Sequence, residues 1–342
     1  MPLQTGKVPP QLLQRLVLQN LGAKRDEVKV SAAFGEDASV LDFSDSPIVI
    51  STDPITAAGA DAGKLAIIIS CNDVAAGGGE PVGVLLTVIM PENSSAEQLE
   101  SIMRQAHETA EQMNVEIVGG HTEVVPQVTE PILSATAVGR AWGGIPHWPI
   151  TSSAAKPGDQ LILTKTAGLE GTAILAADLR DVLLQHGISE ELLRKADALG
   201  DNISVIEEAE LAARGGARAM HDVTEGGVLG AVYEMAAASG TGAYLREGDI
   251  PVAPCTREIC SILDLDPLRL IASGALLISA SPESELVTKL QQQGIGAAVI
   301  GEVTEEQKIK MERRLADGGT TMVALSPPQS DEVWRALERF KD

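Results

Sequence analysis

The chain has 342 residues, of which 44% are hydrophobic and 22% are charged, and its formal net charge is −22. This length exceeds the size at which one hydrophobic core keeps growing, so two domains are expected, and the composition excludes a disordered chain. The negative charge disfavours nucleic acid and anionic membrane surfaces as partners, because both would repel it. Magnesium ions can still bridge the carboxylates of a negative protein to nucleotide phosphates.

The cysteine pattern and the N-terminal segment indicate in which cellular compartment the protein is located. Cys71, Cys255 and Cys260 show neither a CxxC pair nor a metal-ligand spacing, and their odd number is not typical of a disulfide framework. The N-terminal segment lacks a basic region followed by an apolar run, and no apolar stretch of about 18 residues occurs. We therefore expect a soluble protein of the cytoplasm.

The first half of the chain alternates strand and helix patterns. Residues 47–53 and 81–91 are β-branched apolar runs that predict buried strands, and the segment between them predicts a helix. A second helix is predicted from Ser95, which forms a capping box with Gln98 ahead of apolar residues at helical spacing. Residues 115–120 and 132–141 return to strand patterns. A mixed sheet with helices is expected.

The second half begins after residues 143–159, a segment rich in Pro, Gly and Ser that predicts a domain boundary. Strand patterns at 159–168, 274–279 and 296–305 surround helical patterns at 203–214 and 283–294, and residues 331–342 predict a short terminal helix. We predict an α/β (α+β) chain with domains at 1–150 and 151–325 and a terminal helix at 326–342. The similar order of elements leaves an ancient duplication open.

Four polar clusters lie beside the predicted elements of the first half. They are Gly35-Glu36-Asp37, Ser51-Thr52-Asp53, Asn72-Asp73 and Gly119-Gly120-His121-Thr122. Several carboxylates near one cleft are tolerable when divalent cations neutralise them, and Mg²⁺ prefers oxygen ligands together with substrate phosphates. Each aspartate alone could instead cap a turn or a helix. The four clusters together favour a magnesium-nucleotide site.

These clusters resemble the motifs of the AIR synthase (PurM) superfamily of ATP-using enzymes, and the resemblance covers nearly the whole chain. The similar segments are GEDAS at 35–39, STD at 51–53, DAGKLA at 61–66, ND at 72–73, GGHT at 119–122, HDVTEGGVLG at 221–230 and DPLRLIASGALLI at 266–278. The superfamily includes aminoimidazole ribonucleotide synthase, thiamine-monophosphate kinase, selenophosphate synthetase and the hydrogenase-maturation protein HypE. The wording of the motifs is most similar to that of HypE.

The resemblance implies a PurM-like homodimer, in which the N-terminal sheets pair into a β-barrel and ATP lies in a cleft near the dimer interface. It implies that Asp37, Asp53 and Asp73 are magnesium ligands and that Asn72 and Thr122 lie near phosphate. The other nucleotide-binding candidates are Lys64, Gly119, Gly120, Gly226 and Gly227, and the catalytic candidates are Asp37, His121 and Asp222. Lys64 could equally be a solvated side chain, and the glycines at 226–227 a plain helix N-terminus.

The sequence departs from these relatives in several places. His121 stands where many relatives carry an acid, which leaves the number of metal ions open. No cysteine follows Cys260, whereas HypE proteins resemble one another in a C-terminal cysteine that carries the carbamoyl group, and no cysteine precedes residues 35–39 as selenophosphate synthesis would need. His107, His147 and His186 lack partners at catalytic spacing and are interpreted as surface or structural residues.

We therefore expect an ATP- and Mg²⁺-dependent enzyme that phosphorylates and activates an amide-like oxygen of a small molecule or of a partner protein, in hydrogenase or metallocofactor maturation. Two alternatives stay open at this stage. The chain could be a small-molecule kinase or a purine-type cyclase of the same superfamily, or a nucleotide-binding scaffold without turnover.

Overall fold

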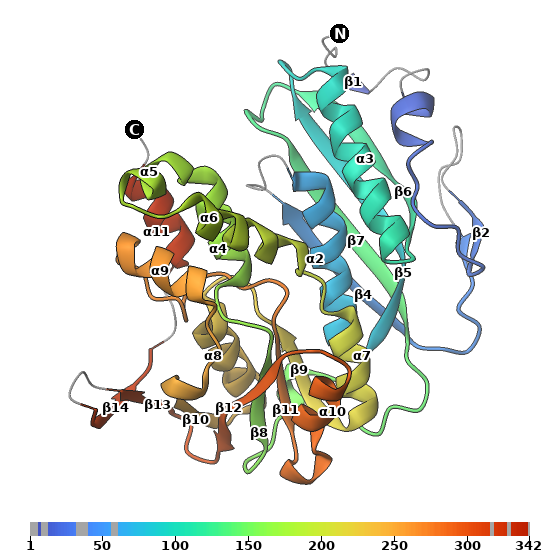
Figure 1. The fold of residues 1–342 in the computed structure, drawn as a ribbon. Coiled ribbons are helices and arrows are strands. Elements are labelled where there is room, and N and C mark those ends of the chain that lie inside the picture. Colours follow the sequence, from blue (N-terminus) through green and yellow to red (C-terminus); the bar gives the residue numbers. More distant parts are fainter. Residues whose placement is uncertain are drawn as a thin grey trace. The chain divides into compact units, whose positions relative to one another are not determined.

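The computed structural model describes residues 6–7, 13–31, 40–55, 61–314, 318–326 and 330–340. The chain forms two units, of which the first comprises Met1–Ala75 and Gly79–Trp142 and the second comprises residues 76–78 and Gly143–Asp342. Each unit contains a sheet and helices, so the predicted α/β class is confirmed (Figure 1). The predicted domain limits at 150 and 325 stay a prediction. Within the described ranges, no helix has the length and apolar character needed to cross a bilayer.

The first unit is built on a five-stranded mixed sheet in the order β1-β6-β5-β7-β4. Strands β5 and β6 run parallel, and the other neighbours are antiparallel. The elements are β1 (Gly6–Lys7), a π-helical turn (Leu13–Val17), β2 (Val28–Val30), β3 (Val40–Leu41), β4 (Ile48–Ile55), α2 (Ala62–Ala76), β5 (Gly79–Pro91), α3 (Ala96–Gln112), β6 (Glu116–Val125) and β7 (Ile132–Ala141). The short strands β2 and β3 pair with each other.

Helices α2 and α3 cover one face of this sheet (Figure 1). Helix α3 follows the predicted pattern: the Ser95 side chain accepts the Gln98 N–H, and the apolar positions from Leu99 to Ala110 are buried. Helix α2 is apolar nearly all round because it packs against both the sheet and α3. The two helices approach closely at Gly63, where a Cβ atom would lie 2.1 Å from the Ile102 carbonyl oxygen.

The second unit contains a seven-stranded sheet in the order β14-β13-β10-β12-β8-β11-β9, in which only the β10–β13 pair is parallel. Its strands are β8 (Gln160–Thr164), β9 (Ala217–Asp222), β10 (Gly242–Arg246), β11 (Leu276–Ala280), β12 (Ala297–Thr304), β13 (Ile309–Arg314) and β14 (Thr320–Ala324). Its helices are α4 (Leu169–Asp178), α5 (Arg180–Gln185), α6 (Glu190–Asp197), α7 (Ile206–Gly215), α8 (Gly227–Ser239), α9 (Pro254–Leu263), α10 (Leu286–Gln292) and α11 (Glu332–Arg339). Helices α4, α6, α9 and α11 share one apolar cluster, and α8 packs on the sheet.

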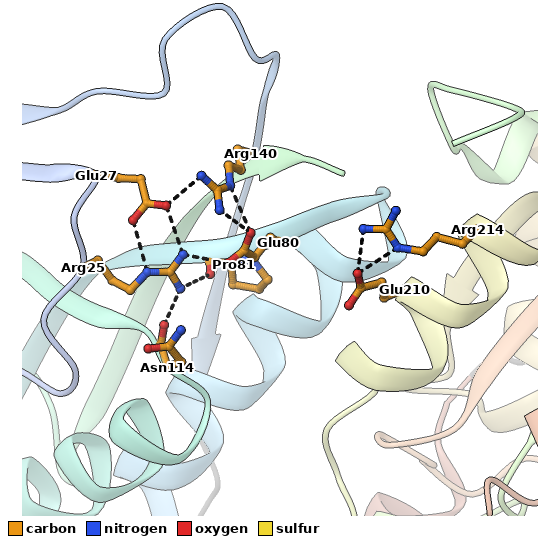
Figure 2. A network of polar contacts seen from close by, with 8 residues as sticks. All are labelled: Arg25, Glu27, Glu80, Pro81, Asn114, Arg140, Glu210 and Arg214. Atoms are coloured by element: carbon orange, nitrogen blue, oxygen red, sulfur yellow. Dashed lines mark hydrogen bonds and ion pairs between the residues drawn. The ribbon is translucent and has the colours of Figure 1, made fainter. Parts of the chain in front are cut away.

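A polar network joins three segments of the first unit (Figure 2). Arg25 contacts Glu27 at 3.2 Å and Glu80 at 2.7 Å, and Arg140 contacts the same two carboxylates at 2.9 Å each. Arg25 also donates to the Asn114 carbonyl oxygen. Two arginines and two glutamates therefore join the segment before β2 to the start of β5 and the end of β7. Figure 2 also shows the Glu210–Arg214 pair within α7, with a 2.8 Å contact.

The three cysteines are all buried as free thiols. Cys71 lies in α2 of the first unit, and Cys255 and Cys260 lie in α9 of the second. Burial raises the pKa of the Cys260 thiol to about 12, with smaller contributions from the negative charges of Asp266 and Glu332. At neutral pH this thiol therefore stays protonated and behaves as a small apolar side chain.

Candidate functional site

Two of the predicted aspartates meet in the first unit. Asp53 lies within β4, and Asp73 lies in the last turn and a half of α2. Ser51 Oγ donates a hydrogen bond to Asp73 Oδ2 at 2.6 Å, and the carboxyl groups of Asp53 and Asp73 are hydrogen-bonded to each other. Ser51 and Asp53 share the helix-covered face because side chains alternate along a strand. The three residues form one oxygen cluster, which we call the β4–α2 cluster.

The surroundings of Asp53 and Asp73 disfavour the ionisation of both carboxyl groups at once. The hydrogen bond to Asp73, burial and the negative charge of Asp73 raise the pKa of Asp53 to about 7. Two carboxyl groups in contact share a proton because both cannot ionise at low cost. A divalent cation would compensate both charges and replace that proton. Asp53 and Asp73 therefore fit the oxygen donor set that Mg²⁺ requires.

The rest of the predicted donor set is not seen in this cluster. Asp37, the third predicted magnesium ligand and a catalytic candidate, lies outside the described residues. Among the described residues, no group of three or more His, Cys, Asp or Glu side chains is arranged to hold a metal ion. The β4–α2 cluster thus supplies two carboxyl ligands, and its predicted role as a metal site stays a prediction.

Two further candidates lie on α2. Asn72 is fully buried and precedes Asp73, so its side chain is rotated by about 100° around the helix from the carboxyl. Lys64 lies nine residues before Asp73, which corresponds to about 13 Å along the helix axis. Its ammonium group is therefore near the other end of α2. The structure keeps Asn72 next to the cluster and separates Lys64 from it.

The GGHT segment lies inside β6 rather than in a turn, because the strand continues from Glu116 to Val125. Thr122 is buried under the helices, whereas His121 is exposed and lies 3.3 Å from the Glu123 carboxylate. Residues that pair across neighbouring strands form a row that runs across the sheet. The row of His121 contains Thr87 of β5, Ser134 of β7 and Pro54 of β4. The Asp53 row is the neighbouring one, so the two side chains point to opposite faces.

Two strands also separate β6 from β4, which corresponds to about 14 Å. Gly120 belongs to the same row as Asp53, through Leu86 and Ala135. Within one chain, Gly119, Gly120, His121 and Thr122 are therefore not brought into contact with the β4–α2 cluster. Their predicted roles at the nucleotide site stay predictions.

In the second unit, Asp222 ends β9 and is buried. The neighbouring His221 places Nε2 2.6 Å from Glu234 Oε2 and Nδ1 4.0 Å from Asp222 Oδ1. The turn that follows has positive φ angles of 81° at Gly226 and 61° at Gly227. A Cβ atom at Gly227 would lie 2.7 Å from the carbonyl oxygens of residues 268 and 270, so this turn requires glycine.

The N–H groups of this turn have partners within the protein. Gly226 N donates to Asp331 Oδ2 at 2.7 Å, and Gly227 N donates to the Thr224 carbonyl oxygen at 3.1 Å. From the sequence, Ser51 is expected only as part of the Ser51-Thr52-Asp53 cluster, and Asp331 is not among the residues singled out. Asp331 is the first residue of the segment predicted as the terminal helix, and the structure makes it the N-cap of α11, a position that aspartate favours. Its contact with Gly226, 105 positions away, has no signal in the local sequence.

Comparison with known proteins gives the family. The N-terminal domain model of AIR synthase related proteins matches residues 35–141, and the C-terminal domain model matches residues 156–314. The chain is 30% identical over 312 residues to a putative hydrogenase expression/formation protein of Methanocaldococcus jannaschii, covering 89% of this chain and 90% of that one. It is 31% identical over 319 residues to the carbamoyl dehydratase HypE of Escherichia coli, covering 90% of each.

A solved structure of the hydrogenase maturation protein HypE in complex with ATP is similar in fold, with a TM-score of 0.78 and 25% identity over 94% of this chain and 95% of that one. The predicted PurM-like two-domain fold is thereby confirmed, as is the resemblance to HypE proteins. The chain belongs to the family of AIR synthase related proteins.

Proposed function

We propose that the chain is an ATP-dependent enzyme of the HypE type, which phosphorylates an amide-like oxygen of a small molecule or of a partner protein during hydrogenase or metallocofactor maturation. The observation that carries this proposal is the β4–α2 cluster, where the Ser51 hydroxyl binds Asp73 and the adjacent Asp73 carboxyl raises the pKa of Asp53, so a bound cation would take the place of a proton. The proposal is supported by relatives named carbamoyl dehydratase and by a related structure that holds ATP.

The chemistry of such an enzyme requires mainly positioning and neutralisation of charge. Removing water from a carbamoyl group requires the amide oxygen to leave, and oxygen leaves more readily as phosphate than as hydroxide. Bound Mg²⁺ would supply charge neutralisation at the transferring phosphoryl group. In this assignment Asp53 and Asp73 hold the ion, Ser51 orients Asp73, and Asn72 and Thr122 lie near phosphate. Asp37 stays the proposed third ligand, and Asp222 and His121 stay proposed catalytic groups.

Two measurements test this function. Titration calorimetry with ATP, with and without Mg²⁺, is expected to show binding that depends on the ion. Phosphate release is then measured with a panel of carbamoyl compounds, amides and candidate hydrogenase-maturation proteins, and one acceptor is expected to stimulate it. Absence of nucleotide binding under all conditions would reject the proposal. Binding without stimulated phosphate release by any acceptor would favour the nucleotide-binding scaffold.

Replacing Ser51 by alanine removes the hydroxyl that donates to Asp73 in the β4–α2 cluster. We expect Mg²⁺-dependent ATP affinity to fall by about 10-fold, because partners that orient a metal ligand typically contribute that much. Ser51→Thr keeps the hydroxyl and should restore most of the affinity. The thermal midpoint of the metal-free protein should change little in both variants. Equal ATP affinity in Ser51→Ala and wild type would show that Asp73 does not need this donor.

The chain is proposed to act as a homodimer through the open face of the first sheet. Ile48 and Ile50 of β4 are 58% and 64% exposed, and Leu85 of β5 is 42% exposed on the same face. Thr136 donates to Thr52 at 2.8 Å beside them, so the face presents apolar groups and satisfied hydroxyls. Such a face is typical of a covered surface, because soluble proteins rarely leave several large apolar side chains together in water.

The dimer is tested by Ile50→Lys, which places a charge among the exposed apolar side chains of that face. Light scattering after size exclusion should give the mass of a dimer for the wild type and of a monomer for the variant, because burying an unpaired charge costs more than the apolar contacts contribute. Met322→Lys, at a 51% exposed position on β14, is the matched control and should stay dimeric. A monomeric wild type, or a dimeric Ile50→Lys protein, would reject the proposed interface.

A further inference from the structure

Three carboxyl groups of the second unit gather where the first turns of α4, α8 and α11 begin. Glu170 is the second residue of α4, Glu225 precedes the glycine turn of α8, and Asp331 caps α11. We call these three residues the carboxyl latch. Asp331 is 3% exposed, and Glu170 is 6% exposed. Two acidic side chains are therefore buried at one place with a third beside them.

The latch joins α11 to the rest of the second unit. Asp331 Oδ1 accepts the Val333 N–H at 2.8 Å within α11, and Oδ2 accepts the Gly226 N–H at 2.7 Å. The Ile271 N–H also donates to this carboxyl. Trp334 of α11 donates from Nε1 to Glu225 Oε1 at 3.2 Å. A helix N-terminus favours an anion. At the N-terminus of α8 the carboxylate of Asp331, a residue of the same chain, occupies this position.

Glu170 is the member of the latch with incomplete hydrogen bonding. Its carboxyl accepts from the hydroxyl and N–H of Ser273, but its Oε2 atom is buried and has no hydrogen-bond partner among the described residues. A buried carboxylate with an unpartnered oxygen costs more free energy than a protonated carboxyl at the same place, because burial penalises the charged form most. Glu170 is therefore expected to keep a proton when exposed glutamates have lost theirs.

The surroundings of the latch support this expectation. Burial raises the pKa of Glu170, and the charges of Asp331 and Glu225 raise it further against the opposing bonds from Ser273. Burial also raises the pKa of Asp331, against its three N–H donors. The ionisable groups that act on Glu170 are Asp331 of α11 and Glu225 of the turn before α8. Arg269 of the segment before Ser273 is directed to Asp266, 3.8 Å away.

We propose that the carboxyl latch holds α11 against the turn before α8 while Glu170 carries a proton and does not repel Asp331. This docking weakens as the pH rises. Below the ordinary pH range of glutamate ionisation, Glu170 is neutral in both the folded and the unfolded chain, so its ionisation does not lower the free energy of unfolding. As the pH rises through the higher range in which the folded chain releases this proton, the favourable contribution is lost. The proton goes to solvent, and Glu170 then repels Asp331.

The latch is also hydrogen-bonded to the segment that contains Asp222. Gly226 belongs to the motif at 221–230, so the conformation of its turn depends on a helix more than 100 residues later in the sequence. The turn is also a poor place for a phosphate group, because the Asp331 carboxyl already accepts the Gly226 N–H there and would repel a second anion. The glycines at 226–227 accordingly serve the docking of α11.

The test compares Glu170→Gln with the wild type, because glutamine imitates the protonated carboxyl in size and charge. Glu207→Gln is the matched control: it is also the second residue of a helix, α7, but it is exposed. Thermal midpoints are measured from pH 5 to pH 8.5. The midpoint of Glu170→Gln should equal that of the wild type near pH 5 and exceed it by about 3 °C at pH 8.5. The control should follow the wild type throughout.

Trp334 reports the docking itself. In a protein with Trp142→Phe and Trp148→Phe, the emission of Trp334 should shift to longer wavelength between pH 5 and pH 8.5 while Glu170 is present. In the same background carrying Glu170→Gln, the emission should stay constant. Parallel midpoints of Glu170→Gln and wild type across this pH range would overturn the proposal. An emission shift of equal size in both proteins would overturn it as well.

Discussion

Asp53→Asn and Asp73→Asn are each expected to weaken Mg²⁺-dependent ATP binding by about 100-fold or more, since even the outer partners of metal ligands contribute about 10- to 100-fold. Each substitution removes one of the two charges that would hold the cation in the β4–α2 cluster. Titration calorimetry of ATP in excess Mg²⁺ measures the loss. Without Mg²⁺, both variants should bind ATP no more weakly than the wild type.

The thermal stability of these variants without Mg²⁺ shows whether weaker ATP binding results from loss of the cation site or from loss of the fold. Neutralising one carboxyl of a pair that shares a proton removes repulsion, so the thermal midpoint without Mg²⁺ should equal or exceed that of the wild type near neutral pH. Asp45→Asn, in the exposed turn before β4, is the control for an aspartate substitution nearby and should bind like the wild type. ATP affinity at the wild-type level in both site variants would refute the assignment of this cluster.

Gly120→Ala is expected to reduce the free energy of unfolding by about 3 kcal/mol. Gly120 has a φ of 146°, and a Cβ atom there would lie 1.9 Å from the Leu86 carbonyl oxygen and 2.6 Å from its carbon. Both obstacles are backbone atoms of the neighbouring strand β5, so they cannot move aside as a flexible side chain would. The β5–β6 pairing must therefore open at this point, which urea denaturation monitored by circular dichroism can measure.

A matched substitution shows whether the close approach causes this loss. Gly143→Ala adds the same methyl group at a position with no atom within 4 Å and without a positive φ, and it should leave stability within about 0.5 kcal/mol of the wild type. A Gly120→Ala protein as stable as Gly143→Ala would show that β6 can shift away from β5. The same result would mean that glycine at this position of the GGHT segment is needed for something other than strand pairing.

Local patterns in the sequence predicted elements whose cause is local. The Ser95 cap and the spacing of apolar residues in α3 depend only on neighbours within four positions, and both are confirmed. The acidic motifs are also local patterns, and the sequence identified them. The sequence did not predict how far the strands around them extend: Asp53 lies within β4 rather than at its end, and GGHT continues β6. Strand length depends on pairing with β5 and β7, which a single segment does not reveal.

The arrangement of the candidate site depends on contacts between distant segments. Ser51 and Asp73 meet because the C-terminal end of α2 lies against β4. His121 points to the opposite face because its register in the sheet differs by one position from that of Asp53. The strand period of two makes such an assignment sensitive to register, which the sequence left undefined. The bond between Asp331 and Gly226 has the same origin, since it joins two segments 105 positions apart.

The burial of Cys71, Cys255 and Cys260 has a practical consequence for following the motions of this chain. A maleimide or spin-label reagent reaches thiols that are exposed and ionised, and the natural thiols are sheltered by the cores of both units. A single cysteine introduced on the surface of α11 would therefore take a label alone, without prior removal of the natural ones. Spectroscopic distances between such a label and a second one on α8 would then record the docking of the terminal helix directly in the folded protein.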